Sequence, residues 1–191
     1  MTTYNRLITR LKVMQANIGF LMRRIELWSL FVPLALTIAL WLLISAGVLR
    51  LEKGPLEITA VVVSGLFMIV AAIRFVFNRH VFFLWCAVML LVIMCREIHF
   101  RGTSEAVYIC LLGLLGIAVL KYERFERYLS DPLLINLLVA GFFTYFISQT
   151  IDQRWWKFVP AEKIVHVSLE EALELVGHCC IGSTSLFRKK I

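Results

Sequence analysis

Three ionisable side chains share one face of a predicted helix near the C-terminal end of the sequence. Glu171, Glu174 and His178 stand at positions i, i+3 and i+7, which a helix places on the same side. Their neighbours are mostly apolar and continue an apolar run that ends at Phe187. Ionisable groups are costly inside a membrane, so a functional site is the default hypothesis for such a helix.

A second polar group follows another apolar run of the sequence. Arg96, Glu97 and His99 come directly after the uncharged residues 81–95. If the apolar segments cross a membrane in alternating directions, this group and the first one lie on the same outer side. Carboxylates and imidazoles are ligands for a divalent metal, and in a row they also form a path for protons or cations.

Three hypotheses about this combined group remain open. The first is an outward-opening site for a proton, a cation or a small polar ligand, formed by Arg96, Glu97, His99, Glu171, Glu174 and His178. The second is a divalent metal, the cofactor this donor set predicts, with Glu97, His99, Glu174 and His178 as ligands. With Glu171 added and a metal-bound water as nucleophile, the second hypothesis describes an intramembrane hydrolase.

The third hypothesis is that the polar group has only a structural role, in a scaffold or assembly subunit of a membrane complex. Arg96 would neutralise Glu171 or Glu174 in a buried ion-pair network, with His99 hydrogen-bonded to it. A direct contact between Arg96 and Glu174 would favour it. Ser168 and Glu171 also have the spacing of a capping box, which predicts a helix start at Ser168 and makes Glu171 favourable in its first turn. Glu174 and His178 have no such explanation.

The composition places the chain in the membrane class. The 191 residues are 60% hydrophobic with a mean hydropathy of +0.82, whereas soluble domains are about 45–50% apolar. Residues 26–191 predict an all-α bundle of about six transmembrane helices, because apolar segments of suitable or nearly suitable length recur. These segments are 27–49, 56–77, 81–95, 106–120, 132–151 and 168–187.

Two of these segments are short, and one connection has a clear helix start. Residues 81–95 and 106–120 have about 15 uncharged residues each, so a re-entrant hairpin is the alternative to two full spans. The charged and aromatic residues 121–128 predict an interfacial helix extension. Ser130, Asp131 and Pro132 then predict a capped helix start with proline in the first turn.

Residues 1–25 predict an amphipathic, basic helix that lies in the membrane interface. The apolar positions recur every three or four residues, as in a helix: Tyr4, Leu7, Ile8, Leu11, Met14, Ile18 and Leu21. Arg6 and Arg10 lie off this stripe. The alternative is a helix packed on the bundle or on a partner subunit.

The basic residues predict both the topology and the partners. Thirteen Lys and Arg residues lie on the side of the termini and seven on the other side, so both termini are predicted in the cytoplasm, with the chain in a plasma or inner membrane. The net charge of +7 is spread between apolar segments. A continuous basic stripe for nucleic acid is missing. The predicted partners are the lipid bilayer and other membrane subunits.

The remaining motifs predict little chemistry. The five cysteines include no C-x-x-C pair and fit small buried hydrophobes, with a Cys95–Cys110 disulfide as the alternative. Haem is not predicted, because His178 lacks a histidine at matched depth. Signatures of nucleotide binding and serine hydrolysis are absent from the sequence. Gly113, Gly116 and the small residues near Gly182 are positions where helices can approach closely.

Overall fold

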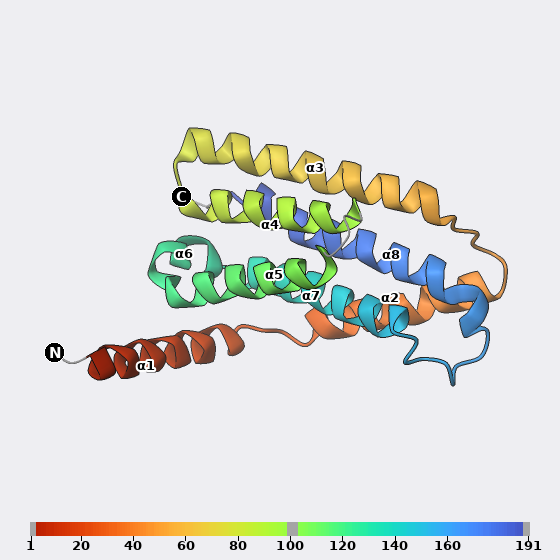
Figure 1. The fold of residues 1–191 in the computed structure, drawn as a ribbon, viewed down its shortest axis with the longest axis horizontal. Helices are drawn as coiled ribbons and strands as arrows, with labels where there is room; N and C mark the ends of the chain where they lie inside the picture. The colour runs from red at the N-terminus through yellow and green to blue at the C-terminus, as the bar shows by residue number, and fades with distance from the viewer. Residues whose placement is uncertain (1–2, 99–102, 189–191) are drawn as a thin grey trace.

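The computed structural model describes residues 3–98 and 103–188, and these residues confirm an all-helical fold. Regular strands do not occur in the two described ranges. Figure 1 shows the helices in chain order, and the last one continues into a short 3₁₀ turn, η1 (Thr184–Leu186). The helices are α1 (Thr3–Met22), α2 (Trp28–Ser45), α3 (Lys53–Asn78), α4 (Val81–Glu97), α5 (Thr103–Leu120), α6 (Tyr122–Leu129), α7 (Pro132–Asp152) and α8 (Glu162–Ser183).

Several of these helices are long and apolar enough to cross a membrane. Among the described residues, α2, α3 and α7 qualify individually by length and composition. Helices α5 and α6 qualify only as one unit, and they meet at an angle of 91°. α4 has only 17 residues, and the apolar part of α8 carries three glutamates. The structure therefore supports membrane integration with three or four candidate spans.

Helix α8 occupies the centre of the bundle. It contacts α2, α3, α4 and α7, and Figure 1 shows it in blue among them. Because neighbouring helices cover it, α8 can carry polar side chains that a lipid-facing helix would expose to hydrocarbon. The bundle thus shields the one helix that bears most of the candidate chemistry.

The predicted start of α8 at Ser168 is wrong. The helix begins at Glu162, six residues earlier, and Ser168 is an internal residue whose Oγ donates a hydrogen bond to the carbonyl oxygen of Leu51 at 2.7 Å. Arg154 forms an ion pair with Glu162, and its hydrogen bonds lower the pKa of that carboxyl because they favour the charged form. Glu171 therefore lies in the third turn, so capping does not explain it.

Two glycines bring α7 and α8 close together. A Cβ atom on Gly141 would lie 2.6 Å from Cγ1 of Ile181, and one on Gly177 would lie 3.0 Å from the ring of Tyr145. The ring of Tyr145 therefore packs directly against the backbone of α8. A Cβ atom added at Gly113 or Gly116 would meet no neighbouring atom within 4 Å, so the close approach predicted there does not occur among the described residues.

The other end of the bundle is closed by α6 and reached by α1. Tyr128 of α6 stacks on Phe82 of α4 with ring centroids 4.5 Å apart, which anchors α6 across the bundle. Asp131 caps α7 through the backbone N–H of Leu133 at 2.9 Å, and Pro132 is the first residue of the helix, which confirms the predicted start. In α1, Asn17 donates a hydrogen bond to the carbonyl oxygen of Val119 on α5.

Candidate functional site

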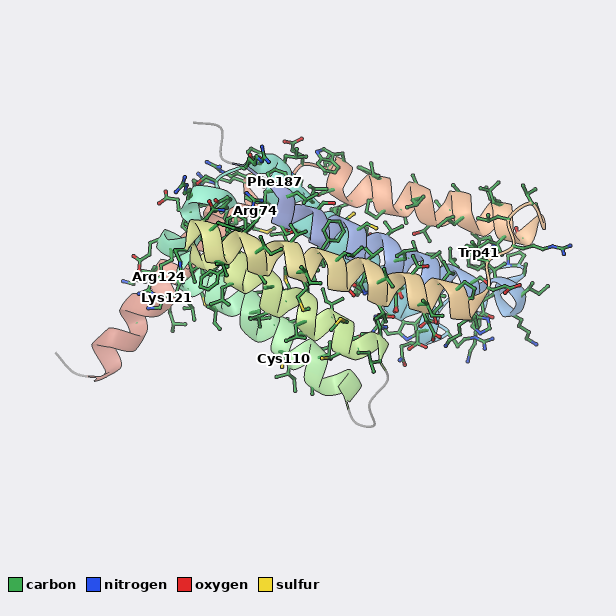
Figure 2. The ribbon with its side chains drawn as sticks, turned by 90° about the horizontal axis from the view of Figure 1, so that it is seen from above. Trp41, Arg74, Cys110, Lys121, Arg124 and Phe187 are labelled. Carbon is green, nitrogen blue, oxygen red and sulfur yellow. The ribbon has the colours of Figure 1, made fainter. Side chains whose placement is uncertain are left out.

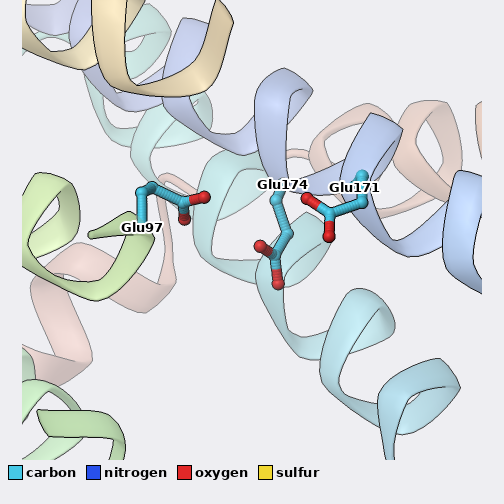
Figure 3. A group of neighbouring side chains, drawn as sticks. All are labelled: Glu97, Glu171 and Glu174. Atoms are coloured by element: carbon cyan, nitrogen blue, oxygen red, sulfur yellow. The ribbon is translucent and has the colours of Figure 1, made fainter. Parts of the chain in front are cut away.

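Three buried carboxylates meet between α4 and α8. Glu97 is the last residue of α4, and Glu171 and Glu174 lie one turn apart on α8. Figure 3 shows their side chains directed toward one another, and one carboxylate oxygen from each lies within 4.8 Å of the other two. None of the three is more than 7% exposed. Like charges this close and this well buried require a cation or bound protons.

Arg96 neutralises part of this charge. Its Nη2 forms an ion pair with Oε1 of Glu174, and its Nη1 lies 3.8 Å from Oε1 of Glu97. Ser148 of α7 also donates a hydrogen bond to Oε1 of Glu174 at 2.8 Å. The contact between Arg96 and Glu174 is the one that favours a structural role for Glu174.

Glu171 has a different cation as its partner. Nζ of Lys53, the first residue of α3, lies 3.3 Å from Oε1 of Glu171 and 3.3 Å from Oε1 of Glu57. The Lys53 side chain is 52% exposed, so water screens its charge. Among the described residues, the guanidinium of Arg96, whose side chain is 17% exposed, and the half-exposed ammonium of Lys53 therefore face three buried carboxylates.

His178 lies fully buried beside this cluster. Its Nδ1 lies 2.6 Å from the backbone oxygen of Glu174 and 2.9 Å from Oη of Tyr145. A carbonyl oxygen only accepts hydrogen bonds, so Nδ1 carries the proton of the neutral ring. Nε2 then presents a lone pair, and it has no hydrogen-bond partner among the described residues. The nearest carboxylate oxygen to it is Oε1 of Glu97, at 3.6 Å.

One predicted ligand lies outside the described residues, and other polar residues at this end of the bundle lie apart from the cluster. His99, a predicted ligand, falls in the range 99–102 that the structure does not describe. Nδ1 of His166 lies 3.2 Å from the carbonyl oxygen of Glu162. Asp152 is exposed at the end of α7, and Glu170 is half-buried on α8. Arg96, Glu97, Glu171, Glu174 and His178 are thus the predicted residues that the structure brings together.

Sequence reasoning missed three contributors to the site. Tyr145 and Ser148 of α7 contact His178 and Glu174, and Lys53 contacts Glu171. The sequence does contain a pattern that indicates Tyr145 and Ser148, because Thr144, Tyr145 and Ser148 place polar atoms at helical spacing inside an apolar segment. No sequence pattern indicates Lys53, because its contact with Glu171 depends on how the start of α3 packs on α8.

The cysteines add no chemistry to this site. All five are free thiols in the structure, so the alternative Cys95–Cys110 disulfide is not formed. Cys86 is fully buried and fits the predicted small hydrophobe, whereas Cys110 and Cys179 are exposed on the helix surfaces.

Comparison of the chain with models of protein families, with curated proteins and with solved structures finds no match.

Proposed function

We propose that the chain is an integral membrane protein with six spans, α2, α3, α4, α5, α7 and α8, whose buried polar site binds and exchanges a proton or a small cation. Both termini would lie in the cytoplasm of a plasma or inner membrane, and the site would open to the outer side. Support for the topology comes from the charge distribution and from the ends of the described chain, which lie at the same end of the bundle in Figure 1.

The observation that carries the proposal is the position of the His178 imidazole. Its Nε2 lone pair lies 3.6 Å from Oε1 of Glu97, and both groups are buried. Two acceptors in this arrangement repel each other unless a proton or a cation lies between them. A proton can be held by either group, so Glu97 and His178 form the exchanging pair.

Arg96 and Glu174 have the complementary role in this proposal. Their ion pair fixes α4 against α8 and holds a permanent positive charge 3.8 Å from Glu97. That charge disfavours a doubly charged ion at the same place more strongly than a proton or a singly charged cation. The predicted structural network and the predicted exchanging site are then two parts of one cluster.

Infrared difference spectroscopy of the full chain in lipid nanodiscs, titrated with acid and base, tests the proposal. We expect a protonated buried carboxyl whose band changes with pH and disappears in Glu97→Gln. The matched control is Glu126→Gln, which removes an exposed glutamate of α6 and leaves the band unchanged. A band that neither pH nor added Na⁺ alters, or one that persists in Glu97→Gln, would rule out the exchanging pair.

A second candidate function, the metal-dependent hydrolase, is favoured by one specific observation. Oxygens from Glu97, Glu171 and Glu174 lie within 4.8 Å of one another, which is close enough for a shared metal ion. The test is the metal content of the purified full chain. We expect less than one divalent metal per chain because of Arg96. A full equivalent that is lost in His178→Ala would replace the first proposal with the second.

A further inference from the structure

A cavity lies at the opposite end of the bundle from the acidic cluster. It has a volume of about 570 Å³ and is formed by α6, the start of α7 and the residues after η1. Its lining includes Arg127, Ser130, Asp131, Leu133, Phe187 and Arg188. Figure 2 shows Phe187, which lines the cavity, near Arg74 at one end of the bundle, and Trp41 at the other end.

The two lining arginines have no ion-pair partner among the described residues. All the ion pairs found there involve residues near the acidic cluster or the start of α8, such as Lys53, Arg96 and Arg154. Among the described residues, Asp131 is the only carboxylate in the lining, and it accepts a hydrogen bond from the backbone N–H of Leu133 at the start of α7. The cavity therefore has a net positive charge that the described part of the chain does not neutralise.

Nearby arginines differ from these two because backbone oxygens already bind them. Arg74 donates to the carbonyl oxygens of Ser185 and Phe187, and Arg24 donates to that of Ser130. These bonds hold the cavity wall in place. Arg127 and Arg188 remain available to an external acceptor, and a guanidinium binds a phosphate group through two parallel hydrogen bonds.

The other residues that line the cavity indicate which kind of molecule carries such a phosphate. Leu133 is 52% exposed, and Phe187, which lines the same cavity, is half-buried. An apolar wall next to two arginines without ion-pair partners, at the end of a helix bundle that enters a membrane, matches the glycerol and acyl portion of a lipid below its phosphate. We propose that this cavity binds the headgroup of an anionic phospholipid. This inference is independent of the proton or cation site.

Native mass spectrometry of the full chain in a neutral detergent, with phosphatidylglycerol as the probe, tests the inference. We expect one saturable lipid per chain and at least roughly tenfold weaker binding in the double variant Arg127→Gln/Arg188→Gln. The matched control Arg23→Gln/Arg124→Gln removes two exposed charges from the same end of the bundle and keeps the wild-type affinity. The double variant Arg127→Lys/Arg188→Lys keeps the charge and regains part of the binding.

Several results would overturn the inference. An equal loss in the pocket variant and in the control would indicate general attraction to a basic surface. Equal affinity for phosphatidylcholine would show that only the apolar wall contributes. Inorganic phosphate that displaces the lipid at comparable concentration would identify a site for a free anion. Unchanged helical circular dichroism of each variant ensures that lost binding does not reflect lost folding.

Discussion

Arg96 reaches from the last turn of α4 to Glu174 on α8, and with its side chain 17% exposed it is the most buried cation that the described residues place in the acidic cluster. Burying an ion pair costs desolvation energy for both partners, which their attraction repays only with good geometry and additional hydrogen bonds. Ser148 supplies one such bond to Glu174. Removing one partner leaves the other charge without compensation in the protein interior.

Mutation of this pair should show strong coupling. We expect Glu174→Gln to lower the free energy of unfolding by about 3 kcal/mol, because it leaves the largely buried Arg96 guanidinium without its partner. Arg96→Gln should have a similar effect. The double variant should lose clearly less than the sum, with a coupling energy above about 1 kcal/mol. Denaturation in mixed detergent micelles, followed by circular dichroism, measures all three, and additive effects would contradict the pairing.

At the residue level, helical spacing predicted which side chains share a face but not which partner each one has. Glu171, Glu174 and His178 have i, i+3 and i+7 spacing, and all three are buried on α8. The partners Lys53 and Ser148 come from other helices, and their choice depends on packing that no local pattern specifies. The capping-box prediction failed because α8 begins six residues before Ser168, and the Ser168 hydroxyl bonds to Leu51, a residue far away in the sequence.

At the level of elements, the contact between α7 and α8 positions Tyr145 against His178. Gly141 and Gly177 permit this contact, since a side chain at either position would meet the facing helix or the ring of Tyr145. Interiors this closely packed respond to even one added methyl group. The orientation of the imidazole therefore depends on two residues that have no side chain.

An alanine at Gly141 should separate these helices. We expect Gly141→Ala to lower the free energy of unfolding by about 1–3 kcal/mol, because its Cβ would lie 2.6 Å from Ile181. Gly113→Ala is the matched control, because open space surrounds that position on α5, and alanine favours a helix by about 0.5–1 kcal/mol over glycine. Chemical denaturation of both variants measures the difference. Equal effects of the two substitutions would show that α7 and α8 pack less tightly at Gly141 than the structure indicates.

The apolar segments of the sequence predicted the elements well, and their boundaries less well. All six segments and the N-terminal segment contain helices, because hydrophobic runs and capping residues act locally. The bend of 91° between α5 and α6 was not predictable, since it depends on the aromatic contacts of Tyr128 with α4. The early start of α8 depends on the ion pair of Arg154 with Glu162.

On the scale of the whole molecule, α3 extends from the end of the bundle that holds the acidic cluster to the end that holds the arginine-lined cavity. Lys53, which binds Glu171, and Arg74, which binds Ser185 in η1 and Phe187 after it, are 21 residues apart on this helix. A rise of 1.5 Å per residue makes this about 31 Å, the thickness of the hydrocarbon core of a bilayer. The two ends of the bundle are thus spaced to lie at opposite membrane surfaces.

Cysteine labelling tests this arrangement in a variant without the five native cysteines. We expect a membrane-impermeant maleimide to label Lys157→Cys, between α7 and α8, from the outer side of intact cells. Arg124→Cys on α6 should react only after the membrane is opened. Both residues are exposed, so neither change should disturb the fold. Labelling of both positions from the same side would contradict the proposed six spans.

The central position of α8 has a consequence for how the protein is made. With three glutamates in its apolar part, this helix partitions poorly into a bilayer on its own. Its four neighbours, α2, α3, α4 and α7, all precede it in the chain, so ribosomes synthesise them first. Lys53, Arg96 and Ser148 can therefore already be in the membrane when Glu171 and Glu174 arrive. The order of the helices lets the polar segment enter a protein surface that is already assembled, instead of entering lipid.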